Sequence, residues 1–441
     1  MSENTGRVLF LELNEFNKEL LKKSSEQLGL KNLQKILSLN ETVAETEDTY
    51  DSDYLEPWVQ WVSVHTGKRS QDHKVKHLGD VPDLTFPQVW EQLGQAGVST
   101  GVWGVLNGSL GNTPNNKFFF PDPWTFSEEA KPSDLNPLLE LPRYMAQNRM
   151  KMSKIKLLFL ACRFMMRLLL SGAFFQFFIE LPRALRMILK YPKSEFAGFC
   201  FAEYLLGLLF IEHWNKYKPD FGILFVNSLA HLQHYYWNGF EYKNNEKLAY
   251  GLYYIDKLAG RLLNTLDLSK DKIVMANALS QMNTNHEEPW ISYRPKDHME
   301  FLTTAGLSIK NVEPLMSYDA LLFFDTEEDA EKAYDVLEKA TVNGKPLFLV
   351  EKYNTNKKKL FYRFQYYSPV TSDTVAEING HKLNFNEHFS MIIQRTGKHI
   401  QRSSVYSNDS ELPKTIWNHE IFDYFVCKFT NKKFETQFAR E

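Results

Sequence analysis

The sequence has little cysteine and almost no net charge. Its three cysteines among 441 residues, Cys162, Cys200 and Cys427, are far apart and stand in apolar surroundings. That spacing excludes a disulfide framework or a zinc-binding cysteine cluster and favours buried thiols in a reducing compartment. The formal net charge is −3, from 51 basic and 54 acidic residues. Because no net field would gather a polyanion, the composition predicts no nucleic-acid partner.

Long uninterrupted apolar runs are also scarce. The run near the N-terminus contains Glu12 and lacks the small-residue cleavage site typical of a secretory signal. The most apolar region, residues 155–189, contains several charged side chains, and its longest uncharged stretch is 168–179. This stretch is shorter than the roughly 20 residues that cross a bilayer. We therefore expect a cytoplasmic protein without a transmembrane helix.

Apolar residues make up 43% of the chain and aromatic residues 14%, which is enough for a large buried core. Continuous apolar runs typical of buried parallel strands occur at residues 8–13, 101–106, 221–226 and 272–276. Amphipathic helical segments, at 86–96, 206–217 and 248–266, precede the last three runs. This alternation predicts a doubly wound α/β sheet.

Two stretches interrupt the alternation. Residues 128–193 form a helix-rich cap insertion, and residues 318–380 read as a small α/β subdomain. Within that subdomain we expect a strand at 320–324, a helix at 327–339, a strand at 347–351 and a hairpin of 360–367 with 375–378. The predicted core is then divided into residues 1–127, 194–317 and 381–441.

The cap insertion is strongly basic. Between residues 151 and 193, lysines and arginines alternate with Leu, Phe and Met, and Glu180 is the only acidic residue. Such helices can lie on an anionic membrane surface or bind a lipid-linked phosphate, which would make the protein peripheral to the inner face of a membrane. The interpretation we favour is that the apolar faces pack on the core.

One fragment of the sequence contains candidate catalytic residues. Residues 56–67 read Glu-Pro-Trp-Val-Gln-Trp-Val-Ser-Val-His-Thr-Gly, with His73 beyond them. The fragment resembles the nucleophile region of the alkaline phosphatase superfamily, particularly its type I phosphodiesterase and nucleotide pyrophosphatase branch. Residues 8–15, 86–104, 221–237, 272–281 and 386–388 resemble further segments of that family in the same order. The resemblance implies an alkaline-phosphatase-like core and a hydrolase or group transferase for a phosphorylated or glycan-type substrate.

Four positions depart from the ligand set that the resemblance implies, which is two zinc ions held by three Asp and three His. Asn14, Ala230, Asn277 and Ala278 stand at these four positions, and Glu56-Pro57 stands where the family has a Thr or Ser nucleophile. Two adjacent zinc ions need carboxylates to neutralise their charge, so we predict fewer than two tightly held zinc equivalents.

The histidines leave two interpretations open. His234 and His388 remain from the implied ligand set, and His231 is an added neighbour. A single zinc on His234 and His388 is one alternative. The other, which we favour, is that these histidines are hydrogen-bonded polar residues of a cleft without a cofactor.

Carboxylates are the candidates to replace the metals. We predict Glu56, His234 and His388 as catalytic residues, because carboxylates and imidazoles in a partly desolvated cleft are suited to acid and base work. The predicted substrate-binding residues are Asn14, Glu15, Trp58, Gln60, His231, Asn277 and Gln281. The loops after parallel strands gather at one edge of a sheet, so we expect this set to converge there. Glu12, inside its apolar run, is expected to have a salt-bridge partner.

Three functions stay open from the sequence. The first is an enzyme of the resembled superfamily without the two-zinc centre. The second is a binding or scaffold protein that kept the fold and lost catalysis. The third is a metal-independent carboxylate enzyme of glycosidase or glycosyltransferase type, built on Glu56. The expected partner in each case is a small molecule or a glycan, lipid-linked if the cap binds a membrane.

Overall fold

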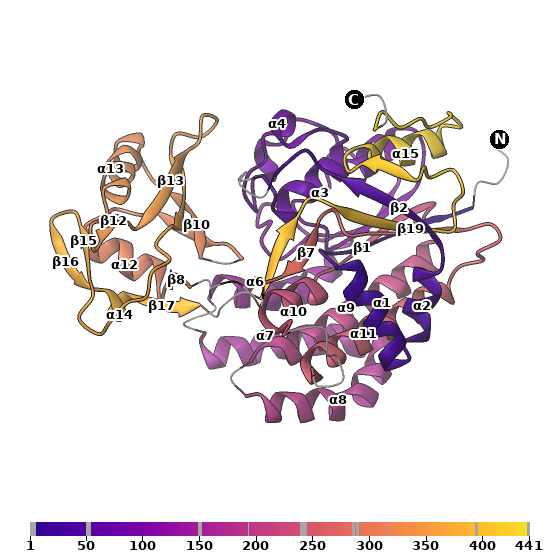
Figure 1. The fold of residues 1–441 in the computed structure, drawn as a ribbon, viewed down its shortest axis with the longest axis horizontal. Helices are drawn as coiled ribbons and strands as arrows, with labels where there is room; N and C mark the ends of the chain where they lie inside the picture. Colours follow the sequence, from indigo (N-terminus) through magenta and orange to yellow (C-terminus); the bar gives the residue numbers. More distant parts are fainter. Residues whose placement is uncertain are drawn as a thin grey trace. The chain divides into compact units, whose positions relative to one another are not determined.

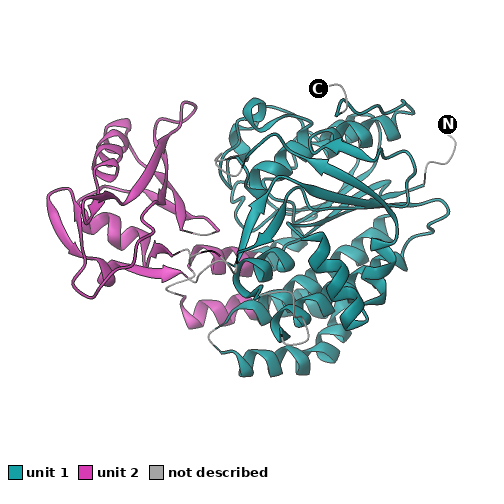
Figure 2. Cartoon of the chain, viewed as in Figure 1, with its two compact units in different colours: residues 1–139, 162–285, 396–441 teal, residues 140–161, 286–395 magenta. Residues whose placement is uncertain are grey.

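The computed structural model describes residues 6–49, 54–148, 152–192, 194–238, 245–284, 287, 291–316, 318–392 and 396–438. The chain divides into two compact units (Figure 2). Unit 1 comprises residues 1–139, 162–285 and 396–441, and unit 2 comprises residues 140–161 and 286–395. Unit 2 therefore contains the expected subdomain of residues 318–380, with longer flanks on both sides. The expected cap of residues 128–193 is divided between the two units.

Unit 1 is built on an eight-stranded, mostly parallel sheet with the order β20-β2-β19-β6-β1-β5-β3-β4 (Figure 1). Its strands are β1 (Val8–Leu13), β2 (Asn40–Glu45), β3 (Thr100–Trp103), β4 (Asn116–Phe120), β5 (Phe221–Val226), β6 (Lys272–Ala276), β19 (Ser403–Ser407) and β20 (Thr415–Trp417). A separate pair is formed by β7 (Ser280–Asn283) and β18 (Gly397–Ile400). The predicted α/β core is confirmed, and the runs predicted at 8–13, 221–226 and 272–276 are the central strands β1, β5 and β6.

Helices cover both faces of this sheet, which is why β1 is buried along its whole length. On one face, Phe10 of β1 contacts Trp61 and Phe425, with ring centroids 6.1 and 4.9 Å away. The helices of unit 1 are α1 (Lys18–Leu28), α2 (Lys31–Leu37), α3 (Pro57–Thr66), α4 (Ser70–His73), α5 (Val89–Gln95), α8 (Ala173–Lys190), α9 (Phe196–Tyr217), α10 (Ser228–Tyr236), α11 (Glu246–Leu263) and α15 (Glu420–Phe429), with short 3₁₀ turns η1 (Val81–Asp83) and η2 (Ser133–Leu135). Helices α3, α5 and α15 lie on the Phe10 face, and α9, α10 and α11 lie on the other (Figure 1).

The chain crosses between the units in two helices, α6 (Asn136–Gln147) and α7 (Lys154–Leu169). Among the described residues, α9 is the helix whose length and hydropathy would allow it to cross a membrane, and 61% of its apolar window is buried inside the protein.

Unit 2 has its own core. Its strands are β8 (Ser292–Pro295), β9 (Asn311–Pro314), β10 (Asp319–Phe323), β11 (Thr341–Val342), β12 (Lys345–Pro346), β13 (Phe348–Lys352), β14 (Lys359–Phe364), β15 (Val375–Ile378), β16 (His381–Asn384) and β17 (Phe389–Ile392), and its helices are α12 (His298–Thr304), α13 (Glu327–Glu338) and α14 (Phe385–His388). The expected hairpin of 360–367 with 375–378 is wrong, because β14 pairs with β13 and β10 whereas β15 pairs with β11 and β16. Three sheets, β13-β14-β10-β9, β12-β11-β15-β16 and β17-β8, share the aromatic core around Phe348 and Phe389.

Glu12 has the partner that its place in an apolar run demands. Its side chain and that of His65 on α3 are both fully buried, and His65 Nε2 lies 2.7 Å from Glu12 Oε1. Burial raises the pKa of Glu12, and the neighbouring His65 offsets only part of that rise.

The three cysteines are free thiols. Cys200 is buried and Cys427 is partly buried, whereas Cys162 on α7 is exposed. The expectation that all three are buried packing residues is therefore wrong for Cys162.

Candidate functional site

Three side chains from distant parts of unit 1 meet at the carboxyl edge of its sheet. Glu15 follows β1, His234 lies on α10 directly after β5, and His399 lies on β18 just before β19. Glu15 Oε2 is 2.9 Å from His234 Nε2 and 3.0 Å from His399 Nε2, and the two Nε2 atoms are 3.2 Å apart. Since β19 runs antiparallel to β6, the segment before it lies at the edge where β1, β5 and β6 end. We refer to these residues as the Glu15 cluster.

Backbone carbonyls fix the tautomers of both histidines. His234 Nδ1 is 3.1 Å from the carbonyl oxygen of Gly397, and His399 Nδ1 is 3.0 Å from that of Leu55. A carbonyl oxygen only accepts hydrogen bonds, so each Nδ1 carries the proton and donates it. In the neutral imidazoles, both Nε2 lone pairs then face the same carboxylate oxygen. Such a group of lone pairs needs a cation between its members, either a proton or a metal ion.

Glu15 is held in an unusual backbone conformation. Its φ of 55° is left-handed, which is uncommon for a non-glycine residue and points to a site under constraint. Gln281 Nε2 donates to Glu15 Oε2 at 2.5 Å, and Asn14 Nδ2 donates to Glu15 Oε1 at 2.9 Å. Burial by itself raises the pKa of Glu15, but His399 and His234 outweigh burial and hold the pKa well below its usual range. The carboxylate is therefore ionised at neutral pH.

Glu56 lies beside this cluster at the start of α3. It is the N-cap residue of the helix, and its Oε2 atom is 3.4 Å from His399 Nδ1. Its side chain is 27% exposed, compared with 3% for Glu15. Glu56 is therefore the carboxylate of this site that solvent or a substrate can reach.

The residues of the Glu15 cluster fit a divalent metal ion. Zinc takes imidazole nitrogen and carboxylate oxygen at about 2.0–2.2 Å, so two tetrahedral ligand atoms lie about 3.3 Å apart. The three distances between Glu15 Oε2, His234 Nε2 and His399 Nε2, from 2.9 to 3.2 Å, are close to that spacing. The Nδ1 to carbonyl hydrogen bonds are the outer-shell contacts that metal-binding histidines typically make. The group that could hold a metal therefore consists of Glu15, His234 and His399.

His388, predicted to act with His234, belongs to unit 2. It ends α14, and its ring packs near Phe301 and Phe389, with centroids 6.3 and 6.2 Å away. The histidine that joins His234 at the Glu15 cluster is His399, which sequence reasoning missed. Its place follows from the pairing of β19 with β6, four residues further along the chain, which no local pattern around His399 encodes.

Several predicted substrate-binding residues make hydrogen bonds to buried groups inside the protein. Gln60 is fully buried, and its amide contacts Asp48, Tyr54 and Asn418. Asn277 is also buried, and it donates to the Phe16 carbonyl and accepts from the Ser404 amide. Both side chains satisfy backbone or core polar groups that burial would otherwise leave unpaired.

The remaining predicted residues have supporting positions. Asn14 and Gln281 hold Glu15 directly. Trp58 donates from Nε1 to the Lys76 carbonyl, and the ring of His231 packs against Tyr235 with centroids 4.7 Å apart. His231 and His234 lie on one helix, and of the two it is His234 that contacts Glu15.

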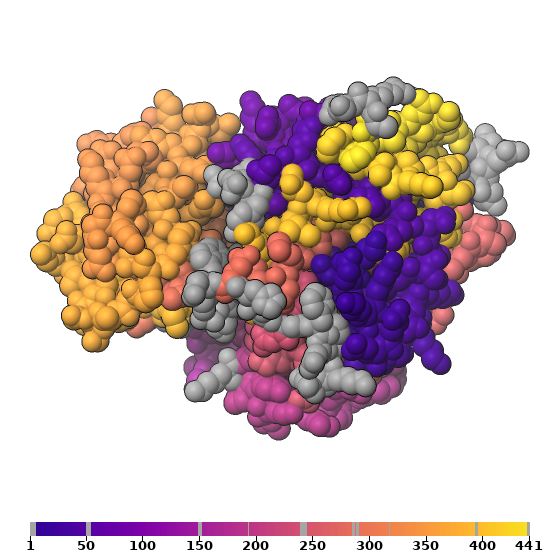
Figure 3. Space-filling model, in the orientation of Figure 1, coloured from indigo at the N-terminus to yellow at the C-terminus, as the bar shows by residue number. Residues whose placement is uncertain are grey.

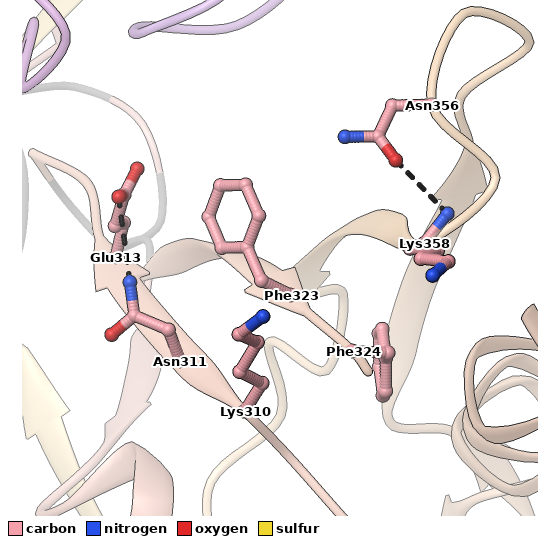
Figure 4. A pocket seen from close by; sticks show the side chains of 7 residues that line it. All are labelled: Lys310, Asn311, Glu313, Phe323, Phe324, Asn356 and Lys358. Atoms are coloured by element: carbon pink, nitrogen blue, oxygen red, sulfur yellow. Dashed lines mark hydrogen bonds between the residues drawn. The ribbon is translucent and has the colours of Figure 1, made fainter. Parts of the chain in front are cut away.

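A pocket of about 340 Å³ lies elsewhere, in unit 2 (Figure 4). It is lined by Lys310, Asn311, Glu313, Phe323, Phe324, Asn356 and Lys358. The ammonium group of Lys310 pairs with Asp325 at 3.1 Å, and that of Lys358 donates to the Asp325 carbonyl. The pocket shares no residue with the Glu15 cluster, and its lining contains no histidine, so we place the candidate site in unit 1.

No protein-family model and no curated protein matches the sequence. Among solved structures, the chain is similar to murine ectonucleotide pyrophosphatase/phosphodiesterase 5, with a TM-score of 0.45, 10% identity and coverage of 98% of this chain and 96% of that chain. It is also similar to phosphonoacetate hydrolase from Sinorhizobium meliloti in complex with phosphonoformate (TM-score 0.43, 13% identity, coverage 97% and 96%). A mutant of the alkaline phosphatase PafA is a third similar structure (TM-score 0.43, 10% identity, coverage 98% and 96%).

The similarity concerns the path of the chain.

Proposed function

We propose that this protein is a hydrolase for a phosphorylated substrate, working with one divalent metal ion bound by Glu15, His234 and His399. The observation that carries the proposal is the arrangement of His234 and His399 around Glu15. The Nε2 atoms of both histidines face one oxygen of the ionised carboxylate, and the Nδ1 atom of each ring is hydrogen-bonded to a backbone carbonyl. Two histidines and one carboxylate form a ligand set used by catalytic zinc sites, which keep a further position open for water or substrate.

Charge balance supports one ion rather than two. The carboxylates of Glu15 and Glu56 carry two negative charges between them, which neutralise a single divalent ion. Asn14, hydrogen-bonded to Glu15 and to Asn227, is neutral and adds no charge for a second ion. The expectation of fewer than two zinc equivalents therefore stands as a prediction, now with one equivalent as the expected number.

An ion bound there would polarise a phosphoryl oxygen and lower the pKa of a water molecule. The chain itself supplies Glu56 as the base that accepts the proton of the attacking water. The N-terminus of α3, which starts at the same place, favours an anionic phosphoryl group through its helix dipole. On α3, the Ser63 hydroxyl is hydrogen-bonded to His73, and the Thr66 hydroxyl donates to the Val62 carbonyl. Because both hydroxyls have these partners, the arrangement supports direct attack by water.

The test combines metal titration with turnover. Metal-stripped protein titrated with zinc or manganese is expected to bind one equivalent and to gain hydrolysis of an aryl phosphodiester. Glu56→Gln should keep the bound equivalent and lower kcat by about 10²–10⁴-fold, because the base is lost while the ligands remain. The matched control is Glu47→Gln, a partly exposed glutamate paired with Arg69, which should change neither value.

Each other outcome selects a different function. Turnover of a glycoside without bound metal would favour the carboxylate enzyme. Neither metal binding nor turnover would favour the binding protein, and two bound equivalents would contradict the charge argument.

A further inference from the structure

Helix α8 has two apolar faces. One face, with Ala173, Ala184 and Met187, is buried where α8 packs on α9. The other face carries Phe175, Phe178, Ile179, Leu185 and Leu189, all exposed to solvent. The helical repeat of 3.6 residues per turn places these five residues along one side of the helix. Phe175 is 73% exposed and Leu189 is 77% exposed, which is far more than isolated surface apolar residues need.

The chain before α8 extends this apolar surface. Met166 near the end of α7 and Leu170 after it are 64% and 80% exposed, and Leu169 is also exposed. Helix α8 lies at the lower edge of unit 1 in Figure 1, and Figure 3 shows magenta atoms of this part of the sequence at the same edge. We call residues 166–170 together with the exposed face of α8 the apolar stripe.

A row of cations follows one flank of the stripe. Arg183, Arg186 and Lys190 are spaced by three and four residues, so they lie along the same side of α8. The side chains of Arg183 and Lys190 are about half exposed. Arg183 stacks on Tyr253 and lies 3.8 Å from Glu180, and Lys190 pairs with Glu246 on α11. Glu180, the one acidic residue of α8, is buried and paired with Lys257. The side chains that α8 itself exposes are therefore apolar or basic, and the acidic side chain paired with the end of the basic row is Glu246 of α11.

We infer that the apolar stripe and its basic flank dock unit 1 on a membrane surface that contains anionic phospholipids. A helix with bulky apolar residues on one face and cations beside them lies in the plane of the interface, with its apolar side about 5–10 Å deep in the lipid. Anionic headgroups are the complement of the basic row. A two-fold dimer through the same face would instead bring two basic rows together, which like-charge repulsion disfavours. The inference is independent of the proposed hydrolase activity.

The experiment measures partition of the full chain onto vesicles of phosphatidylcholine alone and of phosphatidylcholine mixed with phosphatidylserine. Partition onto the phosphatidylserine vesicles is expected to be stronger and to weaken as salt is added, because salt screens the headgroup attraction. Phe175→Asp and Leu189→Asp should each lower partition by about tenfold or more, since each takes a large apolar side chain out of the lipid. Arg186→Gln should lower partition by about fivefold on the anionic vesicles and leave the neutral ones unchanged.

The matched control is Met391→Asp in unit 2, where the methionine is 67% exposed and lies outside the stripe, and its partition should equal that of the wild type. Circular dichroism of each variant verifies folding, which these exposed positions should preserve. Absence of vesicle binding, or wild-type binding by Phe175→Asp, overturns the inference. A dimer that Phe175→Asp breaks, without vesicle binding, also overturns it and assigns the stripe to a second copy of this chain.

Discussion

His399→Ala is expected to abolish metal binding and to lower metal-dependent phosphodiester turnover by at least about 100-fold, whereas His388→Ala is expected to leave both at wild-type values. The first substitution removes one of the three atoms that surround the expected ion, and even loss of an outer-shell partner of a metal site typically costs 10–100-fold. His388 packs among the aromatic rings of unit 2, so its removal leaves the Glu15 cluster intact. Titration calorimetry with zinc and an aryl phosphodiester assay measure the two quantities.

Glu15→Gln separates charge from shape at the same site. The amide keeps the size of the side chain but loses the negative charge that His399 and His234 stabilise, so metal binding should fall nearly as far as in His399→Ala. Thermal melts of all three variants establish that they fold. Equal metal affinity in His399→Ala and the wild type would exclude the Glu15 cluster as the metal site, and loss of affinity in His388→Ala would restore the pair inferred from the sequence.

His65→Ala is expected to lower the free energy of unfolding by about 3–5 kcal/mol at neutral pH, because it leaves the buried carboxylate of Glu12 without its partner. The loss should shrink at acidic pH. Burial already raises the folded-state pKa of Glu12, and removal of the offsetting His65 raises it further. A raised pKa means that the folded state retains the proton more tightly than the unfolded state. The stabilisation that the protonated Glu12 gives to the folded state is therefore complete at pH values below the unfolded-state pKa of glutamate. It is lost as the pH rises through the folded-state pKa of Glu12.

The control is the double variant Glu12→Leu/His65→Leu, which should stay close to wild-type stability, since replacing a whole buried pair by apolar residues is often neutral. Chemical denaturation over a range of pH measures the free energies of unfolding. A destabilisation by His65→Ala that does not change with pH, or a double variant as unstable as the single one, would show that packing rather than the buried charge dominates at this position.

The central strands of the sheet and two of the three residues of the Glu15 cluster were predictable from local patterns. Strands β1, β5 and β6 are buried on both faces, so they are continuous apolar runs with sharp polar ends, and the residues at those ends drew attention to Glu15, His234 and Gln281. The direction of a side chain beyond a strand end has no such signature. Gln60 and Asn277 therefore looked like site residues, although their amides bond inside the protein.

The sequence by itself determined that this chain builds a doubly wound α/β core. That Asn14, Ala230, Asn277 and Ala278 stand at ligand positions of a two-zinc centre is an expectation from its resemblance to a known family. Tertiary structure alone decided which histidine completes the site. Unit 2 closes its own aromatic core around Phe301 and Phe389, and His388 packs against those two rings. The antiparallel pairing of β19 with β6 brings His399 to the edge where β1 and β5 end. Strand direction and pairing are long-range properties of the sheet, so no local pattern around either histidine encodes them.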